Sequence, residues 1–352
     1  METKHDQHES ILEDEVLSTP FVEPILKNPE PAHIPVLRQL GMALFLLVVV
    51  FGTTYVGTVV ALFKPSEQVS DVHVSTRLEP IVSSIEYTDP FGGLSISGRS
   101  AFVWDVREER VLFNKNADET VPLASVAKLM TALVAYELLS DETNVNISIE
   151  AIKTDGDSGL KDGEIFSLKN LTDMVLVASS NDGAAALGKA AGNAIPGAID
   201  PDTLFVRAMN LRARELGLSR THFKNATGLD LSPTEAGAVS SARDVALLME
   251  YIITHYPQVM KLTTTDATLV YNENGEYHEV ENTNEIVNQI DGLIASKTGY
   301  TELAGGNLVV AFEAGLNHPI IAVVLGSTFH NRFTDILALT RSARHYVATQ
   351  PE

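Results

Sequence analysis

Cysteine is absent from this sequence of 352 residues. Its absence excludes disulfide bonds, thiol nucleophiles, iron–sulfur clusters and cysteine-ligated zinc. Basic residues are scarce, since 25 Lys and Arg stand against 46 Asp and Glu, which gives a formal net charge of −21. Nucleic acid is therefore an unexpected partner, because recognition of phosphates needs clustered Lys and Arg. The ten histidines are scattered and form no His-Glu-x-x-His motif, so we expect neither a metal site nor a cofactor.

Charge is also missing from residues 40–63, a run of 24 residues. As a helix this run would rise about 36 Å, enough to cross a hydrocarbon layer of about 30 Å. The alternative is a buried helix of a soluble domain. The run is too long, and too far from the first residue, for an ordinary cleaved signal peptide. We therefore expect an uncleaved signal anchor that passes once through the lipid bilayer.

This run divides the chain into segments of different composition. Residues 1–39 are acidic and rich in proline, which predicts a disordered tail. Residues 64–95 are polar and aperiodic, as in a stalk, and residues 96–348 have the composition of one globular domain. Lys and Arg are balanced on the two sides of the run, so the positive-inside rule does not orient it.

Apolar patterns within residues 96–348 predict a mixed α+β domain with an antiparallel sheet, because strands at both ends flank a helical middle. The expected strands cover residues 101–105, 111–114, 293–298, 307–313 and 320–326, the first two forming a β-hairpin. The expected helices cover residues 125–139, 171–187, 242–253 and 332–346.

The first motif that carries chemistry is Ser125-x-x-Lys128. On a helix this spacing places both side chains on one face, about 5–6 Å apart at Cβ. The apolar surroundings and the helix start should lower the pKa of Lys128, and a neutral lysine can take the proton of a serine hydroxyl. A surface lysine is the simpler interpretation of the motif alone. The second copy, Ser158 to Lys161, lies in a Gly- and Asp-rich stretch and is interpreted as chance.

Two further short motifs follow along the chain. Ser179 and Asn181 come after an apolar run, so a hydroxyl and an amide can point into one cleft. Lys297, Thr298 and Gly299 end a predicted strand, where the first two can face a cleft and the glycine lets a substrate backbone approach. Each alone is more often a polar turn or a strand end. In the order Ser-x-x-Lys, Ser-x-Asn, Lys-Thr-Gly, however, the three are typical of penicillin-binding proteins and serine β-lactamases.

The flanking residues narrow the comparison. The chain resembles the serine D-alanyl-D-alanine carboxypeptidases, which are the low-molecular-weight penicillin-binding proteins, at residues 122–132, 221–230, 240–244, 297–301 with 304–305, and 323–326. The resemblance spans about residues 96–345 and implies a penicillin-binding protein/serine β-lactamase-like fold. The chain departs from the family at Val126-Ala127, where Leu-Thr is commoner, and at Ser180, where Gly or Ala is usual.

The resemblance also implies roles for the matched residues. Ser125 would be the acylated nucleophile, Lys128 its base, and Ser179 the relay of a proton to the leaving amine. Asn181 would bind the amide of the substrate, and Lys297, Thr298 and Gly299 would bind it along the strand. The backbone N–H groups of Ser125 and Tyr300 would form the oxyanion hole. Arg332 would bind the terminal carboxylate of the substrate.

The implied function is that of a membrane-anchored serine D,D-carboxypeptidase. It would remove the terminal D-Ala from peptidoglycan stem peptides through an acyl-enzyme, and β-lactam antibiotics would inhibit it. Such a substrate places the catalytic domain outside the cytoplasmic membrane. The alternatives are a D,D-endopeptidase on cross-bridges, a serine β-lactamase, and an inactive cell-wall-binding module. The β-lactamase is disfavoured because no Glu-x-x-Leu-Asn segment follows Asn181.

Overall fold

A five-stranded antiparallel sheet forms the centre of the computed structural model, which describes residues 89–156 and 158–350. The strand order is β10-β11-β12-β1-β2. These strands are β1 (Ser100–Asp105), β2 (Arg110–Lys115), β10 (Leu293–Thr301), β11 (Gly305–Glu313) and β12 (Pro319–Ser327). The predicted tail and signal anchor lie outside the described residues, and among the described ones no helix is long and apolar enough to cross a membrane.

The sheet joins the first and last strands of the domain. β1 pairs with β2 in the predicted hairpin and on its other side with β12, where Ser100 lies opposite Leu325. The strands predicted at 293–298, 307–313 and 320–326 are present, and each is longer than expected. The predicted α+β class with an antiparallel sheet is confirmed.

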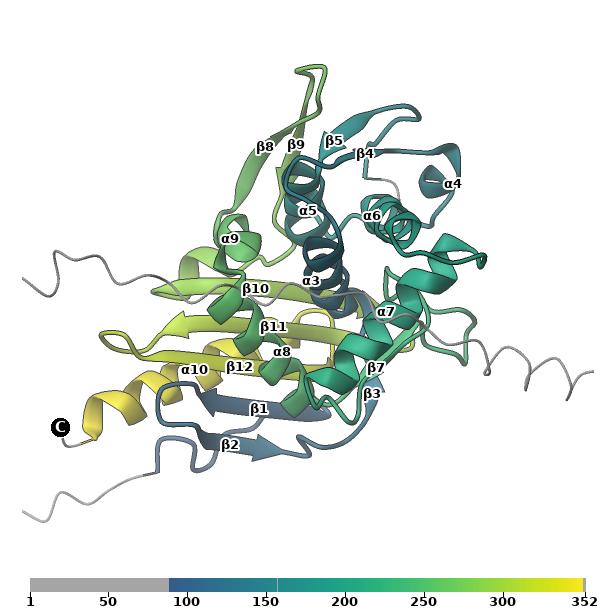
Figure 1. Ribbon diagram of the computed structural model, residues 1–352. Helices are drawn as coiled ribbons and strands as arrows, with labels where there is room; N and C mark the ends of the chain where they lie inside the picture. The colour runs from purple at the N-terminus through teal and green to yellow at the C-terminus, as the bar shows by residue number, and fades with distance from the viewer. Residues whose placement is uncertain (1–88, 157, 351–352) are drawn as a thin grey trace, which may run out of the picture. The chain divides into compact units, whose positions relative to one another are not determined.

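Helices cover both faces of this sheet (Figure 1). On β12, Ile320 packs with residues of α10 (Asn331–Thr349), whereas Ile321 packs in the core that contains α8 (Ala242–His255). Successive side chains of a strand point to opposite faces, so an unbroken apolar run is what a sheet buried on both sides requires. Phe91, within the predicted stalk, is also buried, and its ring stacks on that of Phe113.

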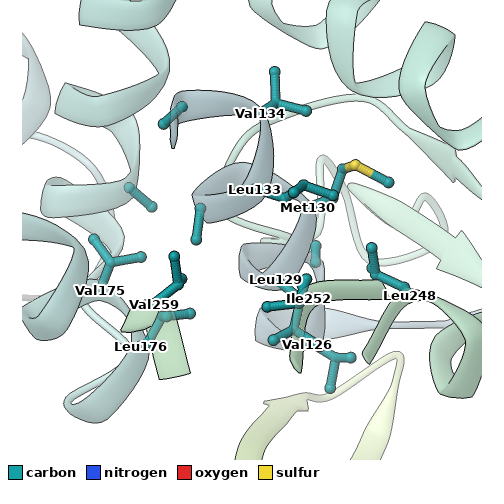
Figure 2. Packing of buried hydrophobic residues seen from close by; sticks show 14 of the residues in the cluster. Val126, Leu129, Met130, Leu133, Val134, Val175, Leu176, Leu248, Ile252 and Val259 are labelled. Carbon is teal, nitrogen blue, oxygen red and sulfur yellow. The ribbon is translucent and has the colours of Figure 1, made fainter. Parts of the chain in front are cut away.

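The helix that begins at Lys128 runs through the core on the α8 face. In α3 (Lys128–Leu138), the first eight residues are all buried. Figure 2 shows Leu129 and Leu133 of this helix among apolar side chains that include Val175 and Ile252 from neighbouring helices. A helix surrounded by other elements has no polar face, which explains its nearly continuous apolar sequence. Its surroundings exclude water from the end that carries Lys128.

The single helix predicted over residues 171–187 is in fact two. α5 (Leu168–Val177) ends, and α6 (Asn181–Ala194) begins after a turn of three residues. In that turn Ser179 has a φ of 62°, a conformation that a continuous α-helix does not allow. Ser180 caps α6 by accepting a hydrogen bond from the backbone N–H of Gly183. The polar run at residues 179–182 marks this break in the sequence, so the single helix predicted over residues 171–187 is wrong across the turn.

Smaller elements complete the domain. A three-stranded sheet has the order β3-β7-β6, and two hairpins pair β4 with β5 and β8 with β9. These elements are β3 (Val121–Pro122), β4 (Asn144–Asn146), β5 (Ile165–Ser167), β6 (His222–Phe223), β7 (Ala238–Ser240), β8 (Ala267–Tyr271), β9 (Tyr277–Glu281), α4 (Ile149–Ile152), α7 (Pro201–Glu215) and α9 (Pro257–Met260).

Candidate active site

The three predicted motifs meet at β10, the edge strand of the sheet. The first lies on the 3₁₀ turn η1 (Ala124–Ala127) and the start of α3, the second in the turn between α5 and α6, and the third on β10. Lys128 Nζ lies 2.7 Å from Asn181 Oδ1, and Lys297 Nζ lies 2.9 Å from Ser179 Oγ. Residues separated by more than 100 positions in the chain therefore share one site.

Lys128 is fully buried and has three polar partners. Its Nζ lies 2.8 Å from Ser125 Oγ, 2.7 Å from Asn181 Oδ1 and 2.8 Å from the carbonyl oxygen of Thr227. A neutral amine has two N–H donors and one lone pair. It can therefore donate to Asn181 and Thr227 and accept the hydroxyl proton of Ser125, which is the arrangement of a general base.

The environment of Lys128 favours its neutral form. Burial lowers the pKa of Lys128 to about 7, and the carboxylate of Asp182 opposes this effect. Burial disfavours the charged form because a low-dielectric interior solvates an ammonium poorly. The desolvation expected from the apolar sequence around Lys128 is present, and a large fraction of its amine is neutral near pH 7.

One serine of the site, and the residue directly before the other, have an unusual backbone conformation. Ala124, directly before Ser125, has a φ of 48°, and Ser179 has a φ of 62°. Residues other than glycine rarely adopt positive φ, and such conformations persist where the surrounding structure enforces them. At Ser125 the enforcement includes Gly228, where an added Cβ would lie 1.9 Å from the carbonyl oxygen of Ala124. The hydroxyl positions are thus held by backbone packing.

Lys297 is the second buried lysine. Its Nζ donates to Ser179 Oγ at 2.9 Å and to the carbonyl oxygen of Thr298 at 2.8 Å. Burial lowers the pKa of Lys297 well below its ordinary value, and the positive charges of Lys128 and Arg332 lower it further. An anionic group placed beside Lys297 and Arg332 would favour the charged form of this lysine and would itself be stabilised.

Asn181 links the site to a loop that sequence reasoning did not include. Its Oδ1 accepts a hydrogen bond from Lys128, and its Nδ2 donates to the carbonyl oxygen of Asp155 at 2.7 Å. The amide therefore holds the amine of Lys128 in this structure. Its expected contact with the substrate amide stays a prediction.

The third motif packs directly against η1. A Cβ added to Gly299 would lie 2.7 Å from the carbonyl oxygen of Leu123 and 3.1 Å from the backbone nitrogen of Ser125. Gly299 thus permits close approach of the strand to the backbone of Ser125, whereas the sequence suggested an approach of substrate. Thr298 is buried, with its hydroxyl 2.6 Å from that of Thr283.

Arg332 belongs to this site and is not an exposed helix-start residue. It is 3% exposed, and its Nη1 donates to the carbonyl oxygen of Gly299 at 2.9 Å. The guanidinium carbon lies 4.4 Å from the ring centre of Phe329 and 4.6 Å from that of Phe333. Its Nε has no hydrogen-bond partner among the described residues. A buried donor without a partner is costly, and a carboxylate would satisfy it.

Two positioning residues escaped the sequence analysis. The Thr227 carbonyl accepts from Lys128, and no side-chain pattern could have pointed to a backbone group. Asn307, fully buried on β11, donates to the carbonyl oxygens of Pro122 and Leu123 at 3.0 and 2.9 Å and so holds the segment before Ser125. A lone Asn at the start of an otherwise apolar strand was the available signal for the second.

A cavity of about 650 Å³ lies beyond Thr227, between α4, α6, α7 and residues 224–231. Its walls contain none of Ser125, Lys128 or Lys297. The reactive groups therefore define the candidate site, and the volume of this cavity does not.

Comparison with known proteins agrees with this geometry. The sequence profile of the D-alanyl-D-alanine carboxypeptidases matches residues 86–328. The carboxypeptidase DacF of Bacillus subtilis is 31% identical over 243 residues, which cover 67% of this chain and 59% of that protein. A D-alanyl-D-alanine endopeptidase of Escherichia coli is 30% identical over 247 residues, or 68% of this chain and 75% of that protein. The match thus spans less than two thirds of the Bacillus protein.

Solved structures of this family resemble the chain as well. Penicillin-binding protein D2 of Listeria monocytogenes, in its ampicillin-bound form, superposes with a TM-score of 0.59 and 30% sequence identity, covering 71% of this chain and 98% of that one. The D-alanyl-D-alanine carboxypeptidase DacD of Francisella tularensis superposes with a TM-score of 0.63 and 25% identity, covering 71% of each chain. The predicted penicillin-binding protein-like fold is confirmed, and the chain belongs to the D-alanyl-D-alanine carboxypeptidase family.

Proposed function

We propose that this chain is a membrane-anchored serine D,D-carboxypeptidase that releases the terminal D-Ala of peptidoglycan stem peptides. The observation that carries the proposal is the buried Lys128, whose Nζ lies 2.8 Å from Ser125 Oγ while its other two partners are hydrogen-bond acceptors. This arrangement leaves the lone pair of a neutral amine for the serine proton, and nucleophilic catalysis by serine requires such a base.

The reaction has two steps. Ser125 Oγ attacks the carbonyl carbon of the penultimate D-Ala while its proton passes to Lys128, and the backbone N–H groups of Ser125 and Tyr300 bind the developing oxyanion. The C–N bond then breaks as the leaving D-Ala nitrogen takes a proton through Ser179. Water hydrolyses the resulting ester, which returns Ser125 as a hydroxyl and releases the shortened peptide.

Arg332 favours carboxypeptidase over endopeptidase action. Its Nε, which has no partner among the described residues, lies near the buried amine of Lys297 and suits a free terminal carboxylate, which would also favour the charged form of that lysine. A cross-bridge substrate carries its scissile bond on a side-chain amine of a second stem. The matched relatives include proteins named for each activity.

The function is tested with the full-length chain in detergent. We expect a fluorescent penicillin to label it covalently and a synthetic stem peptide ending in D-Ala-D-Ala to lose one D-Ala, measured by mass spectrometry. Release from a cross-linked stem dimer at a higher rate would assign endopeptidase action instead. Rapid turnover of penicillin without a lasting label would indicate a β-lactamase, and neither label nor turnover would indicate an inactive binding module.

The proposed substrate also predicts the topology of the chain. Stem peptides are displayed outside the cytoplasmic membrane, so residues 96–348 should lie outside and residues 1–39 inside, with residues 40–63 as the tether. Protease added to intact spheroplasts should degrade the domain and spare an N-terminal tag. An intact domain, under conditions that digest an exported control protein, would show that this orientation is wrong.

A further inference from the structure

Ser180 departs from the family pattern, and its hydroxyl belongs to a small network beside the proposed machinery. Ser180 Oγ lies 2.7 Å from Ser158 Oγ and donates to Asp182 Oδ1 at 2.5 Å, while Ser158 Oγ donates to the same carboxylate oxygen. Ser180 and Asp182 are 2% and 1% exposed. Ser158, set aside as part of a chance motif, thus contacts the turn that carries Ser179 and Asn181.

The loop that carries Ser158 also packs against Asn181 itself. The carbonyl oxygen of Asp155 accepts from Asn181 Nδ2 at 2.7 Å. Gly156 has a φ of +95°, and an added Cβ there would lie 2.7 Å from the same Nδ2. The backbone of this loop is therefore fitted to the amide whose other end holds Lys128.

We propose that Ser158, Ser180 and Asp182 form a latch that holds the loop of residues 153–156 and 158–164 on Asn181 and so fixes Lys128 for acylation. The effect of the latch on acylation rests on the proposed function. Ser158 is then a positioning residue, because it acts through Asn181 and touches neither Ser125 nor Lys128 among the contacts of the described residues.

A purely structural role of Ser180 must be separated from the latch. Ser180 Oγ also accepts from the backbone N–H of Gly183 at 2.9 Å and so caps α6. Removing a cap destabilises a helix whether or not the site is disturbed. Ser158 caps no helix of the described residues, so Ser158→Ala removes the latch without the cap and is the informative variant.

The test measures single-turnover acylation of the full-length chain by a fluorescent penicillin over a range of concentrations. For Ser158→Ala we expect the maximal acylation rate constant to fall about tenfold, the effect of one ordinary hydrogen bond, with the dissociation constant of penicillin little changed. Ser158→Thr keeps the hydroxyl and should restore the rate. Acylation of Ser158→Ala at the wild-type rate would overturn the proposal.

A second network in the chain supplies a matched control. Ser240 Oγ lies 2.7 Å from Thr221 Oγ1, which donates to the buried carboxylate of Asp244 at 2.8 Å. This trio has the same chemistry but no hydrogen bond to Asn181 or Lys128. Ser240→Ala should acylate at the wild-type rate. An equal loss in Ser240→Ala would mean that general destabilisation explains the result, and the latch would be rejected.

Substitution of glycines in the loop tests the contact between the loop and Asn181 by adding a side chain instead of removing one. Gly156→Ala and Gly163→Ala both place a side chain at positive φ, +95° and +80°. The added Cβ meets Asn181 in the first and nothing within 4 Å in the second. We therefore expect Gly156→Ala to acylate about tenfold more slowly than Gly163→Ala. Equal rates would contradict the packing of the loop on Asn181.

Hydrogen exchange separates failure of the latch from failure of the proposed function. A wild-type chain that penicillin does not acylate would refute the function but leave the latch testable. Ser158→Ala should speed amide exchange in residues 153–156 and 158–164 and leave exchange in α8 unchanged, because only this loop loses its attachment. Unchanged exchange in the loop would reject the latch whatever the activity.

Discussion

Ser125→Ala should abolish covalent labelling of the full-length chain by a fluorescent penicillin. The label forms as an ester of Ser125 Oγ, and the variant retains Lys128 without a hydroxyl for it to deprotonate. The hydroxyl of Ser179 lies against Lys297 and not against Lys128 in the described contacts. Mass spectrometry of the wild-type digest should place the label on the peptide that contains Ser125.

The other Ser-x-x-Lys sequence supplies the control for this experiment. Ser158→Ala should still be fully labelled after long incubation, because Ser158 only positions the loop, although its labelling is slower. Wild-type unfolding temperature in Ser125→Ala would show that the chain still folds. A label that persists in Ser125→Ala would refute the assignment of the nucleophile.

Lys128→Arg should lose acylation by a factor of about 10²–10⁴, the usual contribution of a general base. The guanidinium keeps the positive charge but does not give up its proton, so it cannot accept the proton of Ser125. The measurement is the second-order rate constant of acylation by penicillin. Retention of more than about a tenth of the wild-type rate would contradict the role of Lys128.

The pH profile of the wild type provides an independent check that needs no substitution. Burial lowers the pKa of Lys128 to about 7 against the opposing charge of Asp182, and the other titratable group that interacts with it is Lys297, so the neutral, basic form of Lys128 becomes dominant as pH rises through about 7. Acylation should therefore rise about tenfold per pH unit below that value and level off above it. An acylation rate that stays constant between about pH 5 and about pH 8 would exclude a titrating lysine base.

Local patterns in the sequence predicted the parts of the site that depend on local geometry. Ser125 and Lys128 are three residues apart, and a helical or 3₁₀ turn brings such residues together in any fold. The alternation and length of the apolar runs likewise predicted the strands. The structure begins the α-helix only at Lys128, with Ser125 on the preceding 3₁₀ turn, and the contact survives this difference.

Features that arise from distant parts of the chain could not be predicted in this way. Arg332 opens a helix, a position where charged residues are ordinarily exposed, and its burial depends on Gly299 and Phe329. The break at Ser179 coincides with a polar run at residues 179–182, but the positive φ of Ser179 and the contact of its hydroxyl with Lys297 arise only in the folded chain. In both cases tertiary contacts decide the conformation.

The order of strands in the central sheet has a consequence for how the domain is made. β1 pairs with β12, where Ser100 lies opposite Leu325, so β1 gains its second neighbouring strand only after Leu325 has been synthesised. Until then the N-terminal hairpin stands alone, and an isolated hairpin is marginal in water. Such long-range pairing makes folding slow. A chain that is still being synthesised carries Ser125 without Lys297, so its nucleophile stays without the complete site until the last strands have emerged.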